Sequence, residues 1–170
     1  MGDIKDLSHV KPEIRPFIER DLDQMKKIEK RAFVDYPWTS EDFIFFLRRI
    51  GRDHEAYVAE WREHLIGFML VIRFEWFYEI AAIAVTPEFR RVKVGSQLVD
   101  YLKGKLIPYG REEIYARVRE TNKDGQQFFT DQGFSAVERM PSCYDDMSEG
   151  CYKMKYELEE LPLKKEYLHL

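Results

Sequence analysis

The chain has 170 residues, with 27 lysines and arginines against 31 aspartates and glutamates, which gives a formal net charge of −4. This length fits one domain that can bury a hydrophobic core without disulfide or metal staples. The negative net charge argues against nucleic acid as the main partner, because proteins that bind phosphate backbones carry a basic surplus. The apolar stretches are too short to span a bilayer, so we expect no membrane contact.

Two cysteines, Cys143 and Cys151, lie eight residues apart, without a Cys-x-x-Cys or a Cys/His spacing. A structural zinc site needs four ligands, so this pattern predicts no metal site. A disulfide across a hairpin is one interpretation, and two free buried thiols in a reducing cytosol is the one we expect. The first residues show no apolar segment of the kind that directs secretion. We therefore predict a cytoplasmic protein.

The chain divides into a polar lead-in over residues 1–12, one domain over residues 13–158 and a tail over residues 159–170. Within the domain, alternating apolar residues predict strands, and apolar residues three or four positions apart predict helices. In chain order these elements are a strand at 14–18, helices at 21–32 and 39–50, strands at 56–60, 65–74 and 77–85, a helix at 94–106, a strand at 114–119, a helix at 124–131, and strands at 134–139 and 150–158. The order predicts an α+β fold.

Local signals add detail to three of these elements. Thr39 and Asp42 have the spacing of a capping box at the start of the second helix, and Gly51 is positioned to end that helix. The apolar run 80–85 predicts a central strand buried on both faces. The long helix that follows it predicts a right-handed crossover to a parallel strand at 114–119.

Residues 86–96 join this central strand to the long helix and combine basic side chains with a glycine. A helix N-terminus presents unpaired N–H groups and the positive end of the helix dipole, which suits a phosphate. Arg90, Arg91 and Lys93 add positive charge, and Gly95 lets an anion approach the backbone closely. From the residues alone, a pyrophosphate cradle and an ordinary basic loop are equal alternatives.

The same segment resembles the acetyl-CoA loop of the Gcn5-related N-acetyltransferases (GNAT), whose pattern is Gln/Arg-x-x-Gly-x-Gly/Ala. Arg90 stands at the first position and Gly95 at the last, whereas Lys93 replaces the first glycine. Further segments are similar to the family in the same order, namely IRPFIERDLDQMKKIEKRAF, YPW, IAAIAVTPEFRR, VRETNKDGQQFFTDQGF and CYDDMSEGCYKMKYEL. The last of these, and YPW, are similar to ribosomal-protein-alanine and amino-terminal acetyltransferases.

The resemblance implies a GNAT fold: a mixed sheet of six to seven strands with about four helices, whose central parallel pair splays around acetyl-CoA. It also implies which residues bind this co-substrate. They are Ile83, Ala84, Val85, Arg90, Arg91, Val92, Lys93, Val94, Gly95, Ser96, Asn122 and Phe129. Asn122 is equally suited to cap the helix that begins after it.

The family's chemistry is a direct attack of an amine on the acetyl group in a ternary complex. Glu79 corresponds to the base of some eukaryotic amino-terminal enzymes, and Arg117 stands where bacterial relatives of the ribosomal type carry a glutamate. We expect these two to pair, with a structural salt bridge as the alternative. Phe129 stands where much of the family has a tyrosine that protonates the leaving thiolate, so Tyr144 or water takes that role.

The acceptor side is expected to hold Tyr36, Trp38, Arg117 and Tyr152, because aromatic walls and hydroxyl groups suit the backbone of a short peptide. We predict an acetyl-CoA-dependent N-acetyltransferase whose acceptor is a protein N-terminus or a lysine. The alternatives are a small-molecule amine acetyltransferase, for a polyamine or an amino sugar, and a non-catalytic acyl-CoA-binding module. A monomer and a homodimer are both open.

Overall fold

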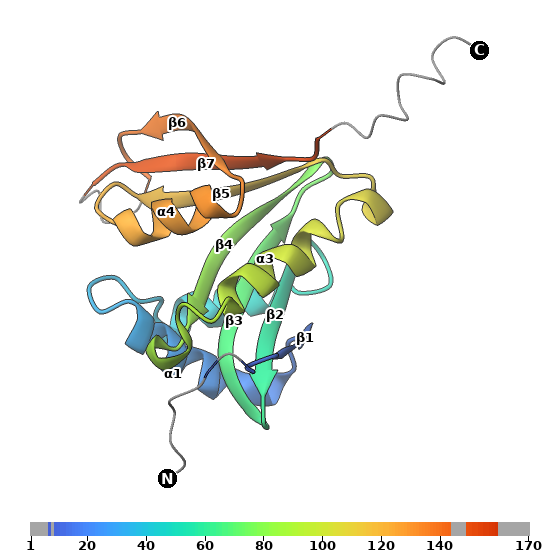
Figure 1. Cartoon of the computed structure of the whole chain (residues 1–170), viewed down its shortest axis with the longest axis vertical. Helices are drawn as coiled ribbons and strands as arrows, with labels where there is room; N and C mark the ends of the chain where they lie inside the picture. Colours follow the sequence, from blue (N-terminus) through green and yellow to red (C-terminus); the bar gives the residue numbers. More distant parts are fainter. Residues whose placement is uncertain (1–6, 8, 144–148, 160–170) are drawn as a thin grey trace. The chain divides into compact units, whose positions relative to one another are not determined.

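The structure is a computed structural model that describes residues 7, 9–143 and 149–159 (Figure 1). These residues form two compact units, which meet in the chain between Arg111 and Glu112. Each unit has its own antiparallel strands, with three α-helices in the first unit and one in the second, and each is considered by itself below.

The first unit is an antiparallel sheet with helices on both faces. Its strands pair in the order of the chain. They are β1 (Glu13–Pro16), β2 (His54–Trp61), β3 (His64–Arg73) and β4 (Phe77–Val85). The helices are α1 (Leu22–Ala32), α2 (Ser40–Leu47) and α3 (Val94–Lys103), with short 3-10 turns η1 (Glu19–Asp21), η2 (Pro87–Phe89) and η3 (Ile107–Tyr109). Pro16 lies in the edge strand β1, where its missing N–H costs no ladder bond.

Side chains alternate along each strand, and this alternation divides the core of the first unit between the two faces of the sheet. On one face, Phe43 and Phe46 of α2 join a buried cluster with Val58, Phe68 and residues of α1. On the other face, α3 crosses the strands (Figure 1), and the ring of Tyr101 packs against Tyr57 with centroids 4.9 Å apart. The hydrophobic residues that repeat every fourth position in α3 explain why this helix packs along the sheet.

The second unit contains β5 (Glu113–Arg119), α4 (Lys123–Asp131), β6 (Ser135–Met140) and β7 (Cys151–Glu157). The strand β7 lies between the other two and is antiparallel to both. A small aromatic core holds α4 to these strands. The ring of Phe129 packs edge-on against Phe128 and Phe134, with centroids 5.1 and 5.0 Å apart.

The expected set of strands and helices is confirmed, with three differences at the level of single elements. The helix α2 ends at Leu47, because the N–H groups of Arg49 and Ile50 bond to carbonyls only three residues back, at Phe46 and Leu47. Gly51 serves the following turn with φ +85. The helix α3 ends at Lys103, and tighter turns follow it, whereas the sequence predicts a helix up to residue 106. Buried and half-buried residues alternate along β4, so this strand is not buried on both faces as the apolar run 80–85 predicts.

The expectation of two free thiols is wrong, because Cys143 and Cys151 form a disulfide with Cα atoms 5.9 Å apart. The reason is the register of the last hairpin. Met140, at the end of β6, pairs with Cys151, at the start of β7, so Cys143 returns close to its partner just beyond the ladder. The alternative interpretation, a disulfide across a hairpin, is confirmed.

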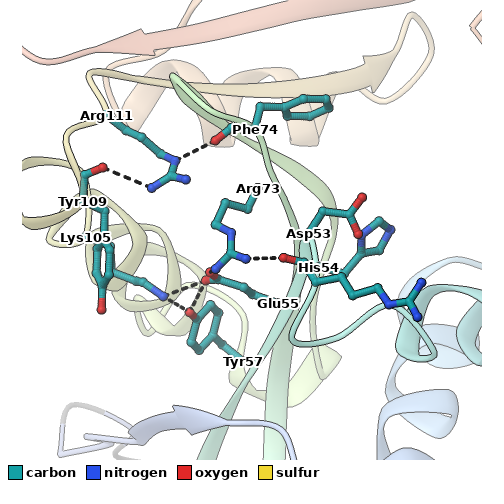
Figure 2. Close-up of polar contacts among 10 residues, drawn as sticks. Asp53, His54, Glu55, Tyr57, Arg73, Phe74, Lys105, Tyr109 and Arg111 are labelled. Carbon is teal, nitrogen blue, oxygen red and sulfur yellow. Dashed lines mark hydrogen bonds and ion pairs between the residues drawn. The ribbon is translucent and has the colours of Figure 1, made fainter.

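A polar cluster on the first unit secures the chain that follows α3 (Figure 2). Lys105 donates to Glu55 at 2.6 Å and to the hydroxyl of Tyr57, which itself donates to Glu55. Burial alone would raise the pKa of Glu55, but the bonds from Lys105 and Tyr57 hold it below its ordinary value. Arg111 donates to the carbonyl of Phe74 at 2.8 Å. The C-terminal end of α3 is thereby tied to β2 and to the β3–β4 turn.

Gly67 of β3 is needed for the close approach of β4 and α3. A Cβ atom at this position would lie 3.0 Å from the carbonyl oxygen of Ala84 and 3.3 Å from Cγ1 of Val94. We expect Gly67→Ala to lower the free energy of unfolding by about 1–3 kcal/mol, because the clash is with backbone. Urea denaturation measures this value. Gly104→Ala is the control, since Gly104 has helical φ and ψ and only ordinary contacts. Equal stability of the two variants would contradict the prediction.

Candidate active site

The loop between β4 and α3 begins at a firmly held residue. The N–H of Thr86 donates to the carbonyl of Ile66 at 2.9 Å, and its buried hydroxyl donates to the same oxygen at 3.3 Å. After the turn η2, Arg91 and Lys93 both adopt left-handed backbone conformations, with φ of 66 and 65. Such conformations cost energy for residues other than glycine, so the surrounding structure must hold them.

The backbone conformation at the start of α3 is of the kind that binds anions. Lys93 is left-handed and Val94 is the first helical residue, and a left-handed residue followed by a right-handed one makes successive N–H groups converge. Lys93 is the N-cap of α3, yet its side chain makes no capping hydrogen bond, whereas Thr39 caps α2 through its hydroxyl. The start of α3 therefore fits a phosphate or pyrophosphate, with the exposed side chains of Arg91 and Lys93 beside it.

The same loop is attached to the end of α1. Arg90, at the first position of the expected acetyl-CoA pattern, donates from Nη2 to the carbonyl of Ala32 at 3.2 Å. Arg31, directly before Ala32, and Glu88, two residues before Arg90, form an exposed ion pair. In this structure the guanidinium of Arg90 thus satisfies the last carbonyl of α1, and the role of Arg90 toward the co-substrate stays a prediction.

A β-bulge interrupts β4 between Glu79 and the expected co-substrate-binding residues. Val71 of β3 pairs with Ile80 and Leu70 pairs with Ala82, so Ala81 is the extra residue. Bulges bend and twist a strand and are common next to active sites. Beyond the bulge, Ile83, Ala84 and Val85 resume the ladder and lead directly into the loop.

The segment between α1 and α2 is held over the same part of the sheet. The ring of Trp38 packs edge-on against Phe43 and Phe46, with centroids 5.6 and 5.7 Å apart. Trp38 belongs to the cluster that also contains Ala81 and Ala82 of the bulge. Tyr36, two residues earlier, is about half exposed. Trp38 and the residues of the β4 bulge therefore pack against the same hydrophobic cluster on one face of the sheet.

Glu79 lies on the sheet face that α2 covers. It pairs with Ile72 across β3, and Ile72 pairs with His54 across β2. Residues directly opposite each other share a face, and the ring of His54 contacts Phe46 of α2 with centroids 4.3 Å apart. The half-buried carboxyl of Glu79 is thus on the same face as Trp38.

The remaining expected site residues belong to the second unit. Asn122 caps α4 by accepting a hydrogen bond from the N–H of Gly125 at 2.9 Å, as expected. Tyr152 of β7 is half-buried, Arg117 of β5 is exposed, and Phe129 is buried in the aromatic core. Tyr144 lies outside the described residues. Because Glu79 and Arg117 belong to different units, their pairing stays a prediction.

One buried residue near this site was not anticipated. Glu29 of α1 is only 2% exposed, its Oε1 accepts from the N–H of Trp38 at 2.9 Å, and its Oε2 has no hydrogen-bond partner among the described residues. Burial raises the pKa of Glu29 to about 7, and Asp42 adds to this effect while the Trp38 N–H opposes it. The sequence pattern of α1 already indicates that Glu29 is buried, because Glu29 lies on the same helix face as Met25 and Ile28.

A family model described as the acetyltransferase (GNAT) family matches residues 22–134. The chain belongs to the GNAT acetyltransferase family. It is similar to an N-alpha-acetyltransferase of Sulfolobus acidocaldarius, with 29% identity over 150 residues, 79% of this chain and 85% of the relative.

Two solved structures share the GNAT fold. The ribosomal-protein-S18-alanine N-acetyltransferase from Escherichia coli has a TM-score of 0.76 at 20% identity, over 89% of this chain and 96% of that one. Ard1 from Thermoplasma volcanium has a TM-score of 0.76 at 23% identity, over 89% of this chain and all of that one.

The expected fold class and the N-acetyltransferase activity of this GNAT protein are therefore confirmed, with acetyl-CoA as its co-substrate. The described residues contain no group of three or more histidines, cysteines, aspartates or glutamates that could hold a metal ion. In the same part of the chain, none of the helices is both long and apolar enough to cross a membrane.

The left-handed backbone at Lys93 is open to a direct test. Lys93→Gly removes the steric cost of this conformation, so the free energy of unfolding should stay constant or rise by up to about 1 kcal/mol. Lys93→Val should lower it by about 1 kcal/mol or more, because a β-branched residue tolerates positive φ poorly. Urea denaturation of the two variants provides the comparison. A valine variant as stable as the glycine variant would show that φ is not positive at this position.

The buried carboxyl of Glu29 predicts a pH-dependent stability. Its pKa is about 7 in the folded protein against 4.5 for an unperturbed glutamate, so the folded state binds more protons between these limits. The free energy of unfolding should therefore fall by about 3 kcal/mol as the pH rises from about 4.5 to 7, and level off above it. Glu29→Gln removes this contribution. The difference in the free energy of unfolding between the wild type and Glu29→Gln should therefore be smaller at pH 8 than at pH 5. Parallel pH profiles in urea denaturation would contradict the prediction.

Proposed function

We propose that this GNAT enzyme acetylates the terminal amine of a protein or peptide. The observation that carries the proposal is that Trp38, Ala81 and Ala82 pack against one hydrophobic cluster, which puts the aromatic segment and the β4 bulge on the same face of the sheet. Aromatic side chains beside exposed backbone suit an extended peptide, whose own backbone needs apolar walls and hydrogen-bonding partners. The relative from Sulfolobus acidocaldarius, which is named N-alpha-acetyltransferase, supports the same acceptor class.

Acetyl-CoA supplies the acetyl group, and the residues of the β4–α3 segment fit it. The N–H groups of Lys93, Val94 and Gly95 would hold its pyrophosphate at the start of α3, with Arg91 adding positive charge. Along β4, alternate residues direct their N–H groups away from β3. N–H groups of Ile83–Val85 with that orientation would stabilise negative charge on the acyl oxygen, and this stabilisation requires no particular side chain.

The acceptor amine must lose its proton before it can attack. We assign this task to Glu79, directly or through a water molecule, because its half-buried carboxyl lies on the same sheet face as Trp38. Phe129 has no proton to give, so the leaving thiolate is protonated by Tyr144 or by water. The expected roles of Arg117 and Tyr152 toward the acceptor stay predictions.

Substitution of Glu79 tests the proposed base. Glu79→Gln should lower kcat by about 10²-fold, because a side-chain base contributes factors of this size, while calorimetry should show unchanged acetyl-CoA binding. Gly95→Glu is the complementary control, in which a carboxylate at the start of α3 should abolish acetyl-CoA binding. An unchanged turnover of Glu79→Gln would exclude this residue as the base.

The acceptor class is tested by release of free CoA thiol across a panel of acceptors. The panel contains peptides with free N-termini, the same peptides with blocked N-termini and an internal lysine, and the small amines spermidine and an aminoglycoside. The proposal expects turnover of the free N-terminal peptides, with mass spectrometry locating the acetyl group on the first residue. If the small amines alone were acetylated, acetylation of small-molecule amines would replace the proposed acetylation of peptides. Acetyl-CoA binding without thiol release from any acceptor would indicate a non-catalytic module.

A further inference from the structure

We propose that Glu29 is a positioning residue for the acceptor side: from within the core, its carboxyl holds the backbone of Trp38 and so fixes the segment from Tyr36 to Trp38 on the sheet face that carries the β4 bulge. The proposal rests on the proposed function only in calling this segment the acceptor side. The contact itself, from the N–H of Trp38 to Oε1 of Glu29 at 2.9 Å, is independent of it.

The segment concerned has little regular structure of its own. The helix α1 ends at Ala32 and α2 begins at Ser40, and the residues between them form neither helix nor strand. Thr39 is bonded to Asp42 of α2 in a capping box, which fixes the far end of the segment. The bond from Trp38 to Glu29 ties the same segment back to α1, so the two helices hold it from both sides.

The chemistry of Glu29 is hard to explain by packing alone. It directly follows the buried Ile28 on α1 and lies one turn after the buried Met25, where an apolar side chain would avoid the desolvation cost of a carboxyl. Its Oε2 has no hydrogen-bond partner among the described residues, so the carboxyl is only partly satisfied. Unlike leucine, Glu29 provides a hydrogen-bond acceptor for a partly buried backbone N–H.

Holding this N–H also holds the indole ring. The ring of Trp38 lies edge-on to Phe43 and Phe46 and belongs to the cluster that contains Ala81 and Ala82. A shift of the Trp38 backbone would move the ring away from Phe43 and Phe46 and so from this cluster. The β4–α3 loop is held through other hydrogen bonds, from Thr86 to Ile66 and from Arg90 to Ala32, which do not involve the carboxyl of Glu29. Loss of the Glu29 contact should therefore affect the acceptor much more than acetyl-CoA.

The first test compares Glu29→Leu, which removes the acceptor without leaving a large cavity, with Glu29→Gln, which keeps a carbonyl oxygen for Trp38. Glu29→Leu should raise the KM for an N-terminal peptide at least 5-fold while the KM for acetyl-CoA changes less than 2-fold, and Glu29→Gln should stay close to the wild type. Asp21→Asn is the control, since Asp21 is equally buried at the other end of α1 and binds Arg15 instead. An unchanged peptide KM in Glu29→Leu, or an equal rise in Asp21→Asn, would overturn the proposal.

The second test needs no turnover. Amide hydrogen exchange is followed by NMR of protein labelled with 15N-tryptophan, in which Trp38, Trp61 and Trp76 are the three tryptophans. Exchange at Trp38 should be at least 10-fold faster in Glu29→Leu than in the wild type or in Glu29→Gln, while exchange at Trp61 stays the same. Equal exchange at Trp38 in all three proteins would overturn the positioning role. Faster exchange in Glu29→Leu, combined with no peptide turnover by the wild type, would retain the role and reject the proposed function.

Discussion

The β-bulge in β4 is the constraint on which the arrangement of the first unit depends. The strand pairs with β3 before and after Ala81, so the extra residue must be absorbed by a local bend. The bulge separates Glu79 from Ile83–Val85, and the strand then continues into the loop that begins α3. One backbone irregularity thus lies between the proposed proton acceptor and the segment that fits a phosphate.

Two kinds of force hold the two sides of this site. The acceptor side depends on hydrophobic packing, because Trp38 lies in a cluster of aromatic and aliphatic residues on the sheet. The co-substrate side depends on backbone geometry, since left-handed residues and the start of a helix direct N–H groups to one place. Both sides are attached to the end of α1, one through Glu29 and Trp38, the other through Ala32 and Arg90. The last turn of α1 is therefore common to both.

Much of the fold was predictable from local patterns. The periodicity of apolar residues placed the strands and helices, and the spacing of Thr39 and Asp42 identified a capping box that the structure contains. The start of α3 and its basic loop were also expected. The ends of α2 and α3 were not, because a helix stops where tighter turns take over its hydrogen bonds, and the apolar pattern continues past that point.

The sequence by itself determined the type and order of the elements, the family resemblance and the basic loop before α3, because these depend on contacts between neighbouring residues. Only the tertiary structure decided that Cys143 and Cys151 pair, since the register of two strands brings them together. It also decided that Arg90 contacts the end of α1 and that a glutamate lies in the core beneath Trp38. These contacts join residues from different elements, and their energies depend on burial, which no local pattern of residues specifies.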